Sequence, residues 1–252
     1  MNSDADRYPG ALDTPNVLAP VQYGPRVTAL SVYLHQQQMI SEDRLAVLFQ
    51  DVFALPISAT TIANHSQAFA AQVTPLTQIV LETLRTAPVK HLDESGLRVA
   101  AKLPFPPSLS NDEWTYYRVT EKRGDIPQGL TGTLVHDHFK PYYTLEHVTH
   151  ALCGAHHLRE LKGLEDIEKE SWTQRLSRLL KLACHHAFTN NQAEQDIRMI
   201  KVKQKISGGF RTLSGAQVFA TTRTFFSSMR KQGVNLFQAI LPPKSILLSR
   251  VS

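Results

Sequence analysis

Apolar residues recur at three- and four-residue intervals over the first third of the chain, which is the spacing of one face of a helix. Three helices are predicted there, over residues 26–38, 41–53 and 58–87. Ser58 is suited to cap the third of them. Because Pro75 lacks the amide hydrogen that a helix interior uses, we expect it to kink or divide that helix.

The second and third predicted helices are separated by a tight break at residues 54–57. A short helix, a break and a second helix resemble a DNA-binding helix-turn-helix. The same pattern describes a helical hairpin packed on the next domain. We favour the hairpin, because the segment is not notably basic.

Alternation of apolar and polar residues replaces the helical spacing after residue 88, which indicates strands. The predicted strands cover residues 89–93, 114–120, 132–137 and 149–153, with a short further strand at 97–99. Residues 103–107 contain three prolines, which cannot donate ladder hydrogen bonds, so we exclude them from any central strand.

Helical spacing returns toward the C-terminus. Helices are predicted over residues 155–169 and 172–186, after Asn190 and Asn191, and over 214–231, with Gly233 as a stop. This order of helices, strands and helices suggests an α+β or mixed α/β fold. We divide the chain into an extended leader (1–25), a helical N-terminal part (26–88), a core (89–240) and a tail (241–252).

Composition places the chain among ordinary globular proteins. It has 252 residues, of which 42% are hydrophobic and 19% charged. No apolar run is long enough to cross a bilayer, and the N-terminus lacks the apolar segment of a secretory signal. Only two cysteines occur, which fits a reducing cytoplasm better than a secreted disulfide scaffold.

Positive charge is concentrated in one segment. Residues 194–231 contain eight lysines and arginines against two acids, a local charge of +6, while the whole chain carries +5. A localised basic patch is the electrostatic signature of a nucleic-acid-binding protein.

Three acidic residues suit a metal site. Asp93 and Asp137 each end a predicted strand, and Glu194 lies near the start of a predicted helix. Open mixed sheets place their chemistry at such strand ends. Carboxylate oxygens are the ligands that Mg²⁺ prefers, and two such cations activate the groups that attack a phosphodiester. A lone strand-end Asp is more often a turn residue, so the prediction depends on all three together.

A row of cations follows Glu194 on the same helix face. Arg198, Lys201 and Lys205 lie four, seven and eleven residues after it. We predict that these side chains, together with Lys203 and Arg211 of the same basic segment, contact DNA phosphates. A solvated helix with Glu–Arg pairs is the alternative interpretation.

A histidine-rich segment offers a competing metal site. His150, Cys153, His156 and His157 have a spacing that zinc sites use, but no second pair of ligands follows at a convincing distance. We instead expect His156 and His157 to approach DNA phosphates or the carboxylates. Cys153 is expected to be a small buried hydrophobic residue.

Several long motifs of this chain resemble the transposases of insertion sequence sixty-six. They cover residues 93–96, 135–142, 150–161 and 190–208, and residues 19–25 are similar as well. The resemblance implies a DDE-class transposase that cuts and joins DNA on an RNase-H-like core with a helical N-terminal part. It implies Asp93, Asp137 and Glu194 as the acidic triad, with Mg²⁺ or Mn²⁺ as cofactor. The implied partners are transposon-end DNA, further copies of the chain and accessory proteins of the same element.

The chain also departs from that family. Asp137 and Glu194 are only 57 residues apart, so a longer helical insertion of the family is absent. The proline-rich residues 103–107 replace an aromatic strand, and a further N-terminal DNA-binding region is expected to be missing. These differences predict a folded but catalytically poor transposase. The alternatives are a non-catalytic DNA-binding remnant and an unrelated RNase-H-like nuclease.

Overall fold

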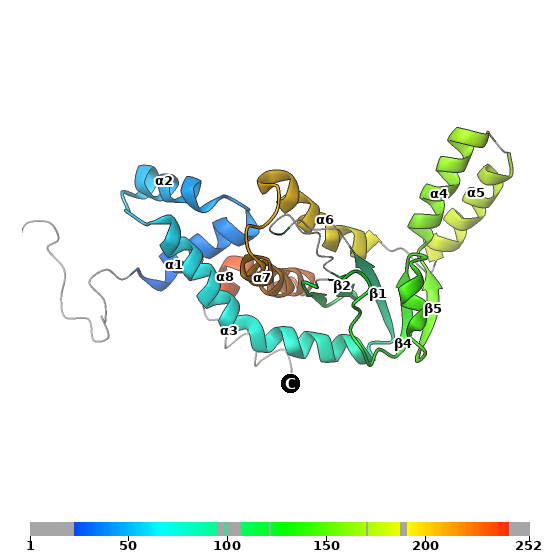
Figure 1. The fold of residues 1–252 in the computed structure, drawn as a ribbon, viewed down its shortest axis with the longest axis horizontal. Coiled ribbons are helices and arrows are strands. Elements are labelled where there is room, and N and C mark those ends of the chain that lie inside the picture. Colours follow the sequence, from blue (N-terminus) through cyan, green and yellow to red (C-terminus); the bar gives the residue numbers. More distant parts are fainter. Residues whose placement is uncertain are drawn as a thin grey trace, which may run out of the picture.

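The computed structural model shows an elongated molecule with helices at one end, a sheet in the middle and a helical arm at the other end (Figure 1). It describes residues 23–94, 99, 107–120, 122–169, 171–186 and 191–241. The expected leader and tail therefore lie almost wholly outside the described residues. No helix in the described part of the chain is both long and apolar enough to cross a membrane.

The N-terminal part consists of helices, as the apolar spacing predicts. Helix α1 (Pro25–Val32) continues into a π-helical turn, η2 (Tyr33–Gln37), and is followed by α2 (Glu42–Phe53) and α3 (Ala59–Thr86). The predicted cap is confirmed, because Ser58 Oγ accepts a hydrogen bond from the Thr61 amide at 3.1 Å. The α2–α3 hairpin shares a small apolar cluster with α1.

Pro75 does not divide the third helix, so that part of the prediction is wrong. α3 runs through it as one helix of 28 residues. Apolar side chains on both sides of the proline, such as Val73, Leu76 and Val80, are buried in the core. Their burial outweighs the one hydrogen bond that a proline removes from a helix interior.

A five-stranded mixed sheet forms the centre of the molecule. Its strand order is β3-β2-β1-β4-β5. The strands are β1 (Val89–Glu94), β2 (Pro107–Ser110), β3 (Thr115–Tyr117), β4 (Gly132–His136) and β5 (Val148–Leu152). β1, β2 and β3 pair antiparallel, and β4 and β5 continue the sheet parallel to β1. The predicted strands at 89–93, 132–137 and 149–153 are confirmed to within a residue, and the one at 114–120 is real but shorter.

The exclusion of the proline-rich segment from the sheet needs a correction. Pro107 begins β2, which lies between β1 and β3 and is paired on both sides. A proline is tolerated as the first residue of a strand, where its missing amide leaves little of the ladder unpaired. Residues 103–106 and 97–98 lie outside the described residues, and Val99 forms an isolated bridge with Phe210.

Gly132 allows β4 to pass close to the end of α3. Its φ of +79° is unfavourable for residues with a side chain, and a Cβ there would lie 2.8 Å from the carbonyl oxygen of Pro88. The next amide, that of Thr133, donates to the same Pro88 oxygen at 2.8 Å. This close approach fixes the start of β4 beside the start of β1.

Further helices follow the sheet. They are α4 (Gly154–Glu168), α5 (Ser171–His186), α6 (Asn191–Ser207), α7 (Leu213–Lys231) and α8 (Leu236–Ile240). A 3-10 turn, η3 (Lys140–Thr144), precedes β5. Helices α4, α5, α6 and α7 match the helices predicted for this part of the sequence. Gly233, with φ +70°, follows the end of α7 as predicted.

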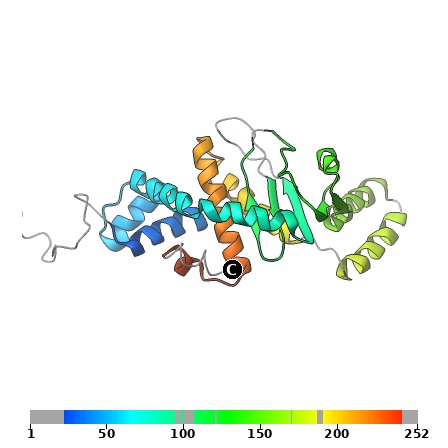
Figure 2. The ribbon, with the colours of Figure 1, turned by 90° about the horizontal axis from the view of Figure 1, so that it is seen from below.

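The main apolar core joins the helical part to the sheet. Its members include Val32 of α1, Leu84 of α3, Leu134 of β4 and Phe225 of α7. Figure 2 shows α3 and α7 crossing beside the sheet. Residues on both sides of the boundary drawn at residue 88 therefore bury one continuous core.

Helix α7 also covers the open edge of the sheet. The amides of Thr115 and Tyr117 in β3 donate to Ser228 Oγ and Thr224 Oγ1 at 3.1 and 3.0 Å. Hydroxyl groups of a helix thus satisfy strand donors that would otherwise be unpaired, which protects the edge from pairing with another chain.

A buried ion pair attaches α6 to this edge. Lys231 Nζ at the end of α7 lies 2.8 Å from Asp196 Oδ2 in α6, and the two side chains are 7% and 6% exposed. Thr115 Oγ1 donates to the same carboxylate oxygen at 3.1 Å, and the Tyr117 hydroxyl donates to the Asp196 carbonyl at 2.8 Å. The first turns of α6 are therefore fixed to β3 and α7 by polar contacts.

Removing one partner of this pair is expected to destabilise the fold strongly. Asp196→Ala leaves the Lys231 ammonium buried without its carboxylate, so the free energy of unfolding should fall by about 3–5 kcal/mol. Urea denaturation measures this change. The exposed Glu113→Ala control should shift stability by less than about 0.5 kcal/mol. The double variant Asp196→Ala/Lys231→Met should lose less than the sum of the two single variants, and full additivity would contradict the pairing.

Candidate active site

Two predicted carboxylates lie at the ends of neighbouring parallel strands. Asp93 is near the end of β1, and Asp137 follows β4 directly. The β1–β4 register pairs His91 with Val135, so the same offset sets Asp93 opposite Asp137. Side chains at such equivalent positions of adjacent strands project to the same side of the sheet. Parallel pairing therefore brings together two acids that are far apart in the sequence.

The net effect of the surroundings of Asp93 is to disfavour its ionised form. Burial raises the pKa of the Asp93 carboxyl to about 6, and the nearby Asp137 carboxylate adds to that rise. His156 and Lys201 lower this pKa, as does the Glu94 amide, which donates to Asp93 Oδ1 at 2.8 Å. Two neighbouring carboxylates in a desolvated place hold an excess of negative charge, which a bound cation would relieve.

Glu94 is an additional acid at this strand end that the sequence patterns do not single out. Its Oε1 accepts from the Gly124 amide at 3.0 Å, and its Oε2 lies 3.5 Å from Nε of Arg123. Burial raises the pKa of Glu94, and Asp137 contributes to the rise. Burial and these carboxylates also raise the pKa of Tyr142. Glu94 sits on the opposite face of β1 from Asp93 because side chains alternate along a strand.

Glu194, the third predicted acid, lies in the first turn of α6, but its side chain is outside the part of the structure that is described. The helix itself is well anchored, because Asp196, two residues after Glu194, forms a buried ion pair with Lys231 of α7. α6 also contacts β1 and β2. The start of α6 is thus positioned beside the strand that carries Asp93, and the position of the Glu194 carboxylate stays a prediction.

The predicted row of cations on α6 is exposed. Arg198, Lys201 and Lys205 face solvent, as does Arg211 after the helix. Lys201 is near enough to Asp93 to lower its pKa. The row therefore begins beside the strand-end carboxylates and continues along α6.

Not every cation of the basic segment belongs to a surface patch. Arg223 is 2% exposed and donates to Gln37 Oε1 at 2.7 Å. Lys231 is buried against Asp196. The sequence count of +6 over this segment therefore overstates the charge that is available to DNA.

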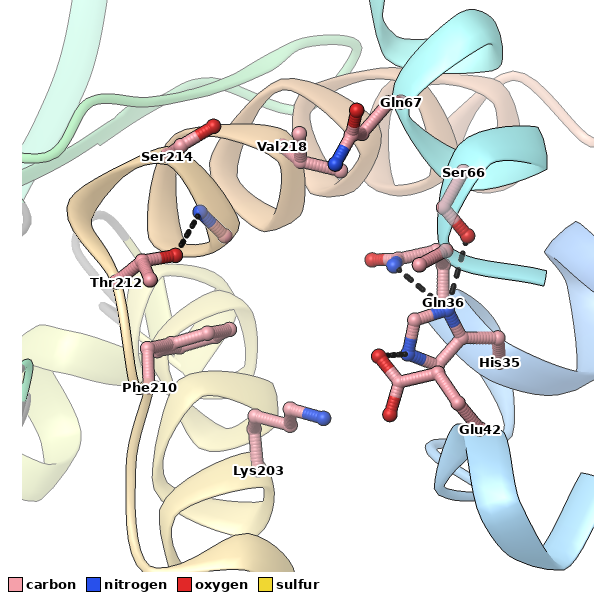
Figure 3. A pocket seen from close by; sticks show the side chains of 12 residues that line it. His35, Gln36, Glu42, Ser66, Gln67, Lys203, Phe210, Thr212, Ser214 and Val218 are labelled. Atoms are coloured by element: carbon pink, nitrogen blue, oxygen red, sulfur yellow. Dashed lines mark hydrogen bonds and ion pairs between the residues drawn. The ribbon is translucent and has the colours of Figure 1, made fainter. Parts of the chain in front are cut away.

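Lys203 also departs from the expected row, because it faces a pocket of about 350 Å³ between α6 and the N-terminal helices. Figure 3 shows Lys203 and Phe210 on one side of this pocket, with His35 and Glu42 on the other. Burial lowers the pKa of Lys203, and Glu42 acts against that change. Lys203 lies two residues from Lys201, which turns it to a different side of the helix.

Of the histidines predicted to lie near the site, His156 is close to Asp93, whereas His157 and His150 contact other residues. His156, in the first turn of α4, is half-buried near Asp93; a hydrogen bond with the Cys153 side chain raises its pKa, and Asp93 adds to the effect. His157 lies 3.7 Å from Glu160 and contacts the ring of His138. Cys153 is buried, as expected. His150 Nδ1 lies 2.9 Å from His136 Nε2.

A buried hydroxyl group lies beside the strand that carries Asp93. Among the described residues, which leave out the Glu194 side chain, no three His, Cys, Asp or Glu side chains gather as a metal site would require. The residue paired with Asp93 across the β1–β2 ladder is Ser108, whose fully buried hydroxyl has no hydrogen-bond partner within the described structure. Oxygen atoms of this kind, beside two neighbouring carboxylates, are ligands or water-binding groups typical of Mg²⁺ sites.

A comparison with protein families gives a match over most of the chain. The model described as Transposase IS66 family matches residues 20–187 and, in a second piece, residues 183–218. The two pieces meet at the end of α5, within the shortened interval between Asp137 and Glu194. No curated protein matches the chain.

The contact between Glu42 and His35 predicts a specific pH dependence. The Gln36 amide nitrogen donates to His35 Nδ1, so His35 Nε2 carries the proton that it shares with Glu42 Oε1 at 3.1 Å. This hydrogen bond lowers the pKa of Glu42 from 4.5 to about 2. The folded state therefore favours the ionised carboxylate, and the resulting stability is complete above pH 4.5 and lost as the pH falls toward 2.

Glu42→Gln should remove this contribution. Because the Glu42 side chain is 41% exposed, the expected loss of stability at pH 6 is at most about 1 kcal/mol. The difference from wild type should shrink between pH 4.5 and 2. Urea denaturation at a series of pH values measures it, with the exposed Glu113→Gln as control. A difference that grows on acidification would contradict the assignment.

Proposed function

This chain belongs to the IS66 family of transposases, and we propose that it is a DDE-type enzyme that cuts and joins transposon-end DNA on an RNase-H-like core. The observation that carries the proposal is the placement of Asp93 and Asp137 at adjacent ends of parallel strands, with a raised pKa at Asp93. A desolvated carboxylate with a shifted pKa beside a second carboxylate is a candidate for a functional site.

The sheet supports the RNase-H-like assignment. Three antiparallel strands followed by two parallel ones place the first and fourth strands side by side in the middle. The two acids lie at the ends of those two strands; α6 contacts β1 and β2, and α3 and α7 contact β3. β2 and β3 complete the sheet in spite of the proline-rich segment, which weakens the expectation of a damaged site.

Asp93, Asp137 and Glu194 are the residues that would hold divalent cations in this proposal. Mg²⁺ or Mn²⁺ held there would supply the charge that activates a water or 3′-hydroxyl and stabilises the leaving oxygen of a phosphodiester. Glu194 joins the set through α6, whose start is fixed beside the sheet by the Asp196–Lys231 pair.

The cations near the carboxylates would bind and orient the DNA backbone. Lys201 and His156 both lie close enough to Asp93 to affect its ionisation. A phosphate that approaches Asp93 therefore meets positive charge from α6 and from the start of α4. Arg198 and Lys205 extend this charge along the exposed side of α6, and Arg211 adds to it after the helix. Contacts of this kind position the backbone without reading base sequence.

Metal binding and cleavage should depend on the same acids. We expect Mg²⁺ or Mn²⁺ to raise the melting temperature of the wild type but not of Asp93→Asn or Asp137→Asn. Cleavage and strand transfer of DNA carrying the ends of the element should fall at least about 100-fold in these variants and in Glu194→Gln. The exposed Asp112→Asn is the control.

Two outcomes separate the alternatives. A wild type that binds metal and DNA but cuts nothing would indicate a non-catalytic remnant. Cleavage that persists in Glu194→Gln, or that needs no transposon end, would favour an RNase-H-like nuclease instead.

DNA affinity should depend on the exposed row of cations. Replacing Lys201 and Lys205 with Gln should weaken binding to any sequence and reduce the slope of log K against log salt by roughly one to two units. Lys203→Gln is a matched control on the same helix, because that side chain faces the pocket (Figure 3). Binding titrations at several salt concentrations measure both. Equal effects of Lys201→Gln and Lys203→Gln would contradict the assignment of the DNA-binding side.

A further inference from the structure

The pocket between α6, the start of α7 and the N-terminal helices is large enough for a small ligand. Its volume is about 350 Å³. Lys203 and Phe210 lie on one side of it, and His35, Gln36 and Glu42 lie on the other (Figure 3). Small-molecule pockets span about 300–1,000 Å³, so this one suits a single ring system better than a long chain. The two strand-end acids are not among the residues that line it.

The lysine and the carboxylate that line the pocket carry opposite charges. Lys203 and Glu42 point toward each other across it (Figure 3). The pKa of Glu42 is lowered to about 2, so its carboxylate is ionised at neutral pH, and its charge raises the pKa of Lys203 against the effect of burial. A phosphate that entered would meet one charge of each sign. The pocket therefore suits a neutral group that both donates and accepts hydrogen bonds.

Gln36 offers such a group an unused hydrogen-bond acceptor. This residue is only 6% exposed and lines the pocket from η2. Its Nε2 donates to His35 Nδ1 at 3.1 Å, whereas its Oε1 has no hydrogen-bond partner among the described residues. A nearly buried polar atom without a partner is uncommon in folded proteins, and a bound ligand or water accounts for it. The exposed Gln67 of α3 adds a second amide to the lining.

Phe210 gives the pocket a flat aromatic surface. Its half-buried ring packs on Phe219 at a centroid distance of 5.2 Å, and Lys203 Nζ lies 5.6 Å from its centroid. Ala63 and Val218 add apolar surface to the lining. Proteins hold a nucleobase that has left the DNA stack between aromatic or apolar side chains and polar groups that bind its edge. A nucleobase is flat, neutral and rich in donors and acceptors, which matches this lining.

The pocket adjoins the exposed cations that are proposed to hold the DNA backbone. Lys201 and Lys205 face solvent two residues before and after Lys203, and Arg211 follows Phe210 directly. Helix α6 thus contributes both to the row of cations and to the pocket wall. A base attached to a phosphate backbone gains from these cations, whereas a free nucleoside, which presents the same base, does not.

We propose that the pocket receives one unpaired nucleobase of the DNA strand that these cations hold. The base stacks on Phe210, and its polar edge meets Gln36 and Glu42. This inference rests on the DNA binding of the proposed function, and it names the part of the DNA that a site away from the carboxylates recognises.

DNA with one unpaired base tests the pocket. A base in a paired duplex must first lose its partner, whereas a bulged base leaves the stack at little cost. The wild type should therefore bind a duplex with one bulged adenine about tenfold more tightly than the same duplex fully paired. A bulged abasic site has the same backbone but no base and should give no gain. Fluorescence anisotropy in the absence of metal measures the three affinities.

Two variants should remove the gain in different ways. Phe210→Leu keeps an apolar side chain but loses the stacking surface, and Ala63→Leu fills part of the pocket. Each should lose most of the roughly tenfold gain for the bulged adenine and bind paired DNA like the wild type. Phe210→Tyr keeps the aromatic face and should retain the gain. Ala68→Leu, at an exposed position of the same helix α3, is the matched control, and thermal melts verify that each variant folds.

The outcomes separate this proposal from the one on which it rests. Equal affinity for paired, bulged and abasic DNA would overturn the pocket assignment and leave the proposed function intact, as would a gain that survives in both pocket variants. Adenosine that raises the melting temperature, with no gain for bulged DNA, would assign the pocket to a free nucleoside instead. A wild type that binds none of the three DNAs would overturn the proposed function itself. The Asp93→Asn variant should keep the full gain.

Discussion

The ion pair between Asp196 and Lys231 is the contact on which the proposed site depends most. A carboxylate and an ammonium that are both almost fully buried are stable only as a hydrogen-bonded pair. Lys231 Nζ also donates to the Asn111 carbonyl at 2.7 Å, and Thr115 and Tyr117 bind Asp196 from β3. One buried charge pair thus ties α6, α7 and the β2–β3 turn into a single unit. Because Glu194 precedes Asp196 by two residues on the same helix, the same contact limits where the third acid can lie.

Helices and parallel strands could be predicted from the sequence because their signals are local. Apolar spacing identified α3, α4, α5 and α7, and strand-end acids pointed to Asp93 and Asp137. The β1–β4 pairing that brings these acids together follows from ordinary α/β geometry. What could be predicted was therefore the fold around the proposed site, as far as it depends on periodicity and on the ends of strands.

The remaining features depend on contacts between distant segments, which no local pattern contains. β2 is four residues long, begins with a proline and shows no alternation of burial, so nothing in its sequence indicates a central strand. Lys203, Arg223 and Lys231 look like members of a basic patch, but Lys203 faces a pocket and the other two bind partners from elsewhere in the fold. Arg223 binds Gln37, which is 186 residues away in the sequence. A count of charges along a segment cannot separate surface cations from such structural ones.

The position of the arm has a consequence for how relatives of this protein are recognised. α4 leaves the sheet directly after β5, and α5 returns toward α6, so the hairpin enters and leaves the core at one place (Figure 1). Its helices contact mainly each other. A lineage can therefore lengthen or shorten this hairpin by whole helices without moving the strands that carry the first two acids. The number of residues between the second and third proposed acids would then vary with the length of this hairpin, and a search that requires a fixed spacing would overlook proteins with the same core.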